Sequence, residues 1–130
     1  MGLVLLDSTV LIDVLRGRPA ADRLLALRRT SDALCTSAIN VEEIVRGLRD
    51  DEQRVADRLF TGLEVLPIGQ REAETAGRWR REHARRGTTL HQADCLIAAA
   101  AHLRGARLAT GNPADFPMAE LLVEHWPVGR

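Results

Sequence analysis

Acidic side chains at the ends of apolar segments are the residues of this chain whose types and spacing suit chemistry. Asp7 directly follows the aliphatic run 3–6 and precedes Ser8-Thr9, a pair that favours the start of a helix. The run predicts a buried parallel strand, which puts Asp7 at the carboxyl end of that strand, where open α/β sheets bind ligands. An Asp between a strand and a helix can also serve only as a helix cap, so this position alone does not establish a site.

Asp94 is the second acid in an unusual place. Ile97, Ala98 and Ala101 follow it at helical spacing, so Asp94 lies on the apolar, inward side of a predicted helix. An ionised carboxylate in such a place is costly unless something compensates its charge. The sequence leaves two compensations open, an ion pair with a distant arginine or a bound metal ion.

Two further acidic positions have ordinary structural explanations. Asn40 and Glu43 have the spacing of a capping box, and Glu43 lies off the apolar stripe of its helix. Asp115 falls in a predicted turn, where Asp is common for backbone reasons. Taken together, several carboxylates near strand ends and helix starts, without a cluster of Cys or His, indicate an oxygen-ligand site for Mg²⁺ or Mn²⁺.

Composition limits the classes of protein that can carry such a site. A length of 130 residues predicts one domain, 1–130, and the 18 basic and 18 acidic residues cancel. Cys35 and Cys95 lie within apolar stretches, which favours buried thiols over a disulfide. No apolar run approaches the roughly 18 residues of a membrane span, and no signal peptide is recognisable. We therefore expect a cytoplasmic protein that does not interact with membranes.

Alternating strands and helices must position these acids. Strands are predicted over 3–6, 33–36, 64–68, 107–110 and 121–124. Helices are predicted over 8–16, 20–29, 41–48, 50–63, 70–86 and 91–104. This alternation predicts a three-layer α/β/α sandwich with a mostly parallel central sheet.

The order of the motifs resembles that of PIN-domain ribonucleases, and specifically of VapC-type toxins from toxin–antitoxin pairs. The matching segments span nearly the whole chain, at 7–13, 43–47, 94–99 and 108–116. The resemblance implies a catalytic acidic site of Asp7, Glu43 and Asp94, in which Asp7 and Asp94 bind Mg²⁺ or Mn²⁺. The fourth acidic position of the family falls on Asn112, so either Asn112 holds a water of the metal shell or Asp115 substitutes for it. Asn112 is favoured and is assigned to the catalytic residues with Asp7, Glu43 and Asp94.

The same resemblance implies an endoribonuclease that hydrolyses RNA phosphodiesters with a metal-activated water. The four-residue spacing to Gly47 assigns the catalytic position to Glu43 rather than to Glu42. Ser8 and Thr110 are expected to orient the scissile phosphate or the water.

The predicted helix 70–86 is expected to bind the RNA backbone. Three of its arginines share one face, Arg78, Arg81 and Arg85. A merely solvated helix face is the alternative.

Partners also follow from the resemblance. A cognate VapB-like antitoxin is expected to neutralise the enzyme, with its C-terminal segment in a groove between the helices at 20–27 and 50–63 and with a cation near the acids. The chain is expected to form a homodimer, and a heterotetramer or larger complex with the antitoxin.

Other functions remain open at this point. A PIN nuclease that processes RNA without being a toxin would have the same motifs, and an antitoxin gene upstream distinguishes the two. A non-catalytic, receiver-like ligand-binding module would also place acids at strand ends, but it would not require Asp94 on an apolar stripe. A phosphatase of the haloacid dehalogenase type needs an acid at the position of Thr9, and a nucleotide-binding protein needs a Gly-rich phosphate loop, which is missing.

Overall fold

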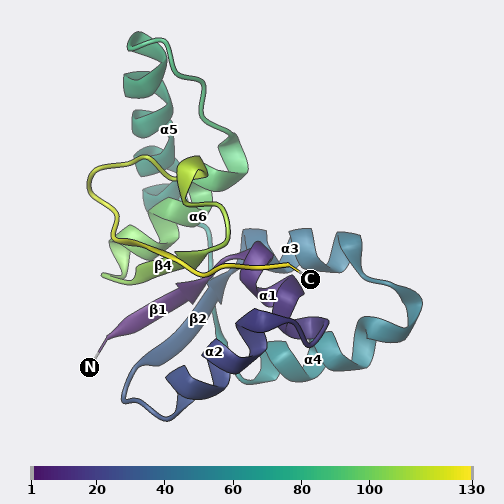
Figure 1. The fold of residues 1–130 in the computed structure, drawn as a ribbon. Coiled ribbons are helices and arrows are strands. Elements are labelled where there is room, and N and C mark those ends of the chain that lie inside the picture. Colours follow the sequence, from purple (N-terminus) through teal and green to yellow (C-terminus); the bar gives the residue numbers. More distant parts are fainter. Residues whose placement is uncertain (1, 130) are drawn as a thin grey trace.

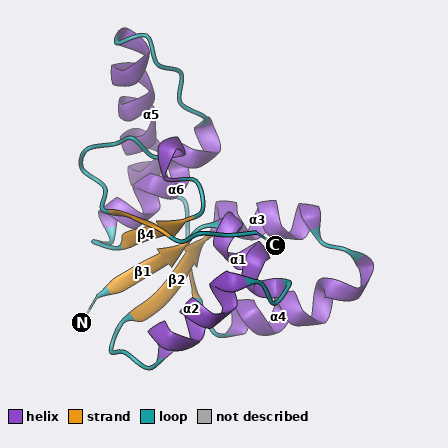
Figure 2. Ribbon diagram, in the orientation of Figure 1, coloured by secondary structure: helices purple, strands orange, loops and turns teal. Residues whose placement is uncertain are grey.

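Five parallel strands form the centre of the molecule (Figures 1 and 2). The computed structural model describes residues 2–129. The sheet has the order β3-β2-β1-β4-β5 and consists of β1 (Leu3–Leu6), β2 (Ala33–Ser37), β3 (Glu64–Leu66), β4 (Arg107–Thr110) and β5 (Val123–His125). All its pairings are parallel, which confirms the predicted sheet. β5 begins two residues later than predicted, because the Leu121 amide donates to the Met118 carbonyl in a turn. β3 ends two residues earlier than predicted, at Leu66, directly before Pro67, which has no amide proton to donate to a neighbouring strand.

Helices cover the two faces of the sheet and complete three layers (Figure 2). One face carries α1 (Ser8–Leu15), α2 (Pro19–Arg28) and α4 (Gln53–Thr61), and the other carries α5 (Gln70–Arg85) and α6 (Gln92–Leu103). The remaining helix, α3 (Ala38–Gly47), follows β2 and contacts both α1 and α6. Short 3₁₀ helices lie at Asp50–Glu52 (η1) and Pro113–Asp115 (η2). Among residues 2–129, no helix has the length and hydropathy needed to cross a bilayer.

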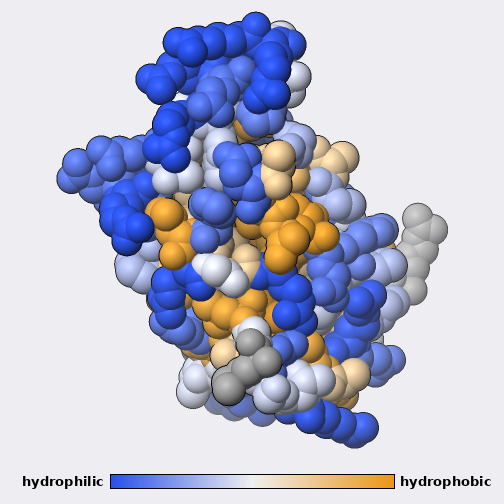
Figure 3. All heavy atoms as spheres, turned by 90° about the vertical axis from the view of Figure 1, so that its left-hand side faces the viewer, coloured by the Kyte–Doolittle hydropathy of each residue, from blue (hydrophilic) through white to orange (hydrophobic). Residues whose placement is uncertain are grey.

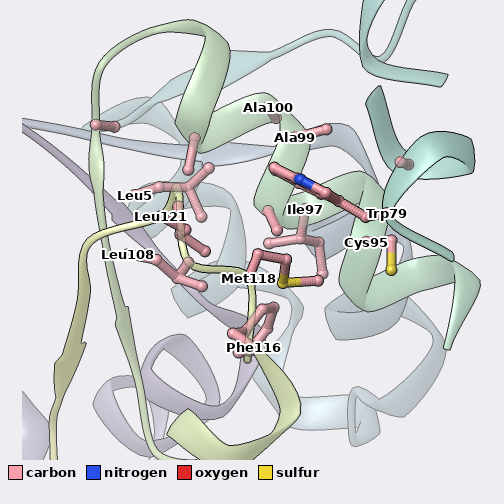
Figure 4. Close-up of a cluster of buried hydrophobic side chains, with 14 of the residues drawn as sticks. Leu5, Trp79, Cys95, Ile97, Ala99, Ala100, Leu108, Phe116, Met118 and Leu121 are labelled. Carbon is pink, nitrogen blue, oxygen red and sulfur yellow. The ribbon is translucent and has the colours of Figure 1, made fainter. Parts of the chain in front are cut away.

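The side chains of β1 alternate between two apolar clusters, as a strand covered on both faces requires. Leu5 packs toward α5 and α6, where Trp79, Ile97 and Phe116 are buried with it (Figure 4). Val4 belongs to the opposite cluster, with α1, α2 and α4. The sheet is therefore held in place on both faces.

Both cysteines are buried free thiols, as the sequence predicts. Burial raises the pKa of Cys35 to about 12 and that of Cys95 to about 11. Neither thiol is therefore a nucleophile at neutral pH.

The strand order brings the ends of β1, β2 and β4 together. β1 lies at the centre of the sheet, with β2 on one side and β4 on the other. From β1, the chain adds β2 and β3 on one side of the sheet and later β4 and β5 on the other. Such a switch point in the strand order is where parallel sheets open a crevice. Asp7, Ser37 and Thr110 stand at or directly after these three strand ends.

Candidate active site

Asp7 lies at this crevice with its carboxylate held from both sides. The residue is only 6% exposed. Its Oδ2 accepts hydrogen bonds from Thr110 Oγ1 at 2.7 Å and Thr9 Oγ1 at 3.3 Å, and its Oδ1 accepts one from Asn40 Nδ2 at 3.1 Å. A carboxylate offers roughly four lone-pair positions, so these three bonds leave about one for a ligand.

The possibility that Asp7 only caps a helix is wrong. Asp7 occupies the N-cap position of α1, but its side chain makes no capping hydrogen bond. The carboxylate is turned instead toward β4 and α3. Burial raises the pKa of Asp7, and the hydrogen bonds from Thr110, Thr9 and Asn40 oppose that rise. The fold thus holds a desolvated carboxylate at the end of its central strand.

Glu43 reaches the same crevice from α3. It lies in the second turn of this helix and not in the first turn, where the predicted cap would place it. The prediction that Asn40 caps this helix is wrong, because β2 ends at Ser37 and Ser37 is the N-cap. Asn40 is the third helical residue and completes a capping box with Ser37. Glu43 is consequently not needed for capping, and its Oε1 accepts a hydrogen bond from Ser8 Oγ at 2.7 Å.

Asp94 lies half-buried in the first turn of α6. Within residues 2–129 it forms no ion pair, so the alternative of a distant arginine partner is wrong. Burial is the largest cause that raises its pKa to about 6, followed by the negative charges of Asp115, Asp7 and Glu43. The predicted acids from four separate segments therefore share one electrostatic neighbourhood.

At the fourth acidic position, Asp115 provides a negative charge that acts on Asp94, whereas the amide of Asn112 is neutral. Asp115, at the end of η2, is the acid that raises the pKa of Asp94 most. The Asn112 side chain is exposed, while its backbone amide donates to Thr110 Oγ1 at 3.1 Å. Asn112 thus closes the loop after β4 through its backbone.

Two hydroxyls that were expected to orient RNA or water are buried and engaged with the acids. Ser8 is 8% exposed and donates to Glu43, and Thr110 is fully buried and donates to Asp7. Direct contact with RNA does not fit this burial. Both hydroxyls hold carboxylates instead, because their protons are already directed at them.

Asn40 and Thr9 are site residues that the sequence reasoning missed. Asn40 donates to Asp7, and Thr9 Oγ1 both contacts Asp7 and accepts the Gly111 amide at 2.9 Å. The available signal was the spacing of Ser37 and Asn40, which is that of a cap followed by its partner at the third helical position. That signal places Asn40 one turn before Glu43 on the inner side of α3.

The donor set suits a hard divalent cation. All the candidate ligands are oxygens, and within residues 2–129 no arginine forms an ion pair with Asp7, Glu43, Asp94 or Asp115. The mutual repulsion that raises the pKa of Asp94 is what a cation would relieve. In the same described range, no three His, Cys, Asp or Glu side chains are grouped closely enough to enclose an ion. Mg²⁺ fits such a site because it is commonly bound by one or two carboxylates and keeps several waters.

The predicted basic strip lies apart from the core, on α5. Arg78, Arg81 and Arg85 are exposed, and none of them forms an ion pair within the described part of the chain. The carboxyl-terminal half of α5 projects from the body of the molecule (Figure 1), and hydrophilic side chains cover this end in the space-filling view (Figure 3). The positive charge of the strip is therefore free for an external anion.

Known proteins match this chain over almost its full length. The model of the PIN domain family matches residues 4–117. Ribonuclease VapC10 of Mycobacterium tuberculosis is 38% identical over 124 residues, which cover 92% of this chain and 90% of that protein. The tRNA(fMet)-specific endonuclease VapC of Salmonella typhimurium is 28% identical, with 94% of this chain and 96% of that protein covered.

A similar fold is seen in a solved structure of DNA-bound VapBC from Salmonella typhimurium. The two chains have a TM-score of 0.83 at 28% sequence identity, over 97% of this chain and 99% of the other. The chain belongs to the PIN domain family, among relatives that are VapC ribonucleases.

Proposed function

We propose that this protein is a metal-dependent endoribonuclease that acts as the toxin of a toxin–antitoxin pair. The observation that carries the proposal is the gathering of Asp7, Glu43, Asp94 and Asp115 at the carboxyl end of the sheet, without a compensating ion pair among the described residues. Membership of the PIN family and the named activities of its VapC relatives support it.

Each acid has a distinct task in the proposed hydrolysis. Asp7 and Asp94 would hold Mg²⁺ or Mn²⁺, which when bound polarises a phosphate and lowers the pKa of a water molecule. Ser8 holds Glu43 Oε1, which would leave Oε2 to accept a proton from the attacking water. Asp115 contributes negative charge at the fourth position, with Asn112 closing the loop beside it.

RNA would be held by charge on α5. Arg78, Arg81 and Arg85 lie on the exposed side of the helix and match the phosphate backbone without reading a base sequence. The acids could not hold the backbone themselves, because they repel it. Binding and cleavage are therefore assigned to different elements.

The antitoxin would occupy a groove between α2 and α4. This groove has a volume of 380 Å³ and is lined by apolar residues that include Leu24, Leu25 and Val55, with Arg28 and Arg58 at its sides. An amphipathic antitoxin segment fits such a surface, and a cation on it would neutralise the acids. We further propose a homodimer, which sedimentation measurements would reveal, and a cytoplasmic location, where RNA and antitoxin are made.

The decisive experiment measures cleavage of single-stranded RNA by the purified protein. Cleavage should require Mg²⁺ or Mn²⁺ and stop in EDTA. Asp7→Asn should abolish it while leaving the circular dichroism spectrum unchanged, and Asp51→Asn, the same change at an exposed acid of η1, should cleave normally. Full activity in EDTA, or in Asp7→Asn, contradicts the metal-nuclease function.

The toxin role has a separate test. Expression of the chain should slow growth, and co-expression of the product of the gene just upstream should restore it. A protein that cleaves RNA but neither slows growth nor binds that product is the RNA-processing nuclease of the alternative.

A further inference from the structure

Asn40 is a polar side chain with 0% exposure that joins the start of α3 to the acidic site. Its Oδ1 accepts hydrogen bonds from Ser37 N–H at 3.1 Å and Ser37 Oγ at 2.7 Å. These two donors fix which end of the amide carries the oxygen. The Nδ2 end must therefore face the other way, toward β1.

Both protons of that Nδ2 are used at the site. One is donated to Asp7 Oδ1 at 3.1 Å and the other to Ser8 Oγ at 2.9 Å. Because Ser8 Oγ accepts from Asn40, its own proton is directed to Glu43 Oε1 at 2.7 Å. A single buried amide thus sets the orientation of two carboxylates that come from different elements.

We propose that Asn40 is a positioning residue of the acidic site, because it orients the carboxylates of Asp7 and Glu43 for metal binding. The inference rests on the proposed function, since it concerns the same acids. Asn40 occupies one lone pair of Asp7 Oδ1 and, through Ser8, one of Glu43 Oε1, so the remaining lone pairs face the crevice in fixed directions. Without the amide, the Asp7 carboxylate is held only from the β4 side by hydroxyls, and the Ser8 hydroxyl is free to turn away from Glu43.

The test compares two variants that weaken the same helix cap. Asn40→Ala removes the cap partner and the donor to Asp7, whereas Ser37→Ala removes the cap but leaves the donor to Asp7 in place. A third variant, Asn40→Asp, keeps an acceptor for Ser37 and replaces the donor with a carboxylate oxygen that repels Asp7. For each we would measure thermal unfolding, Mn²⁺ affinity by calorimetry, and kcat and KM for single-stranded RNA.

Asn40→Ala and Ser37→Ala should both unfold at lower temperature, but only Asn40→Ala should bind Mn²⁺ more weakly and lose kcat, by about 10- to 100-fold each. The KM for RNA should stay unchanged, since Asn40 does not touch the substrate. Asn40→Asp should lose kcat to at least the same degree.

Equal Mn²⁺ affinity and equal kcat in Asn40→Ala and Ser37→Ala would overturn the inference, as would wild-type kcat in Asn40→Asp. If the wild-type protein cleaves no RNA, the proposed function fails. The comparison of Mn²⁺ affinities still decides the role of Asn40 in that case.

Discussion

At this site, the burial of the carboxylates opposes their ionisation. Asp7 and Asp94 both have a raised pKa, and in both the first cause is the loss of water around the carboxylate. Hydrogen bonds compensate Asp7, whereas Asp94 is further destabilised by its acidic neighbours. In the absence of a cation, Asp94 is therefore a source of instability at neutral pH.

This conflict predicts how stability depends on pH. The pKa of Asp94 is about 6 in the folded state and about 3.9 in the unfolded chain. The folded state keeps its proton over a range in which the unfolded state has lost it, so the contribution of Asp94 to stability falls as pH rises from about 4 to about 6. Asp94→Asn does not titrate. In EDTA its melting temperature should exceed that of the wild type by about 3 °C or more above pH 6, and the difference should shrink toward pH 4.

The control for this experiment is Asp51→Asn, which changes an exposed acid of η1. Its melting temperature should follow that of the wild type throughout. Mn²⁺ at pH 7.5 should stabilise the wild type and not Asp94→Asn, because only a ligand that prefers the folded state raises the melting temperature. A constant difference between Asp94→Asn and the wild type from pH 4 to 8 contradicts the assigned titration.

Among the elements, α5 differs most from the rest of the molecule. Its inner side is anchored by Trp79, whose Nε1 donates to Glu120 at 2.7 Å, and by the contact of that ring with His102 on α6. Its outer side carries arginines that the described structure does not pair. A helix fixed on one side and positively charged on the other is suited to hold a polyanion.

The arginine strip can be tested through the salt dependence of RNA binding. We would replace Arg78, Arg81 and Arg85 with Gln in the Asp7→Asn background and titrate single-stranded RNA at several salt concentrations. Loss of three phosphate contacts should make the slope of log K against log salt shallower by about 2 and weaken binding at low salt.

A triple replacement of the exposed Arg18, Arg29 and Arg54 with Gln serves as control, because it removes the same charge from the two residues that flank α2 and from α4. Its salt slope should stay close to that of the parent. Equal slopes for both triple variants would mean that α5 attracts RNA only through the net charge of the protein.

At the scale of the whole molecule, the two faces of the sheet have different tasks. α5 and α6 supply the proposed RNA strip and Asp94, whereas α2 and α4 form the groove proposed for the antitoxin. Leu25 and Val55 stand 59% and 41% exposed in that groove, although they belong to helices whose other side is buried. Exposed apolar side chains that share a groove are typical of an interface.

Leu25→Glu should therefore weaken the antitoxin complex without unfolding the chain. Burial of one leucine at an interface is worth about 1.5–3 kcal/mol, so calorimetry with the upstream gene product should show at least a roughly tenfold weaker affinity. Leu122→Glu changes another exposed leucine, 75% exposed and outside the groove, and should bind normally. RNA cleavage by Leu25→Glu alone should be unchanged. Equal affinities of Leu25→Glu and Leu122→Glu for the antitoxin would contradict its binding in this groove.

Most of the fold follows from local patterns in the sequence. The aliphatic run before Asp7 and the alternation of strands with helices are short-range features, and the structure agrees with them. Gly87 and Gly105 directly follow the predicted helices 70–86 and 91–104, and both adopt the positive φ that ends a helix. The sequence also predicts that Asp94 faces inward, because helical spacing alone shows on which side a residue lies. After β4 the agreement is less close, because β5 begins at Val123 and the sequence predicts a strand from residue 121.

The relations across the site needed the tertiary structure. The spacing of Ser37 and Asn40 is compatible with a cap, but the start of α3 depends on how far β2 extends, and only the tertiary structure shows that Asn40 faces Asp7. Likewise, the hydroxyls of Ser8 and Thr110 bind carboxylates because segments 35 and 103 residues apart meet at the end of β1. Hydrogen bonds between distant segments leave no periodic trace in a sequence, since they depend on packing rather than on spacing.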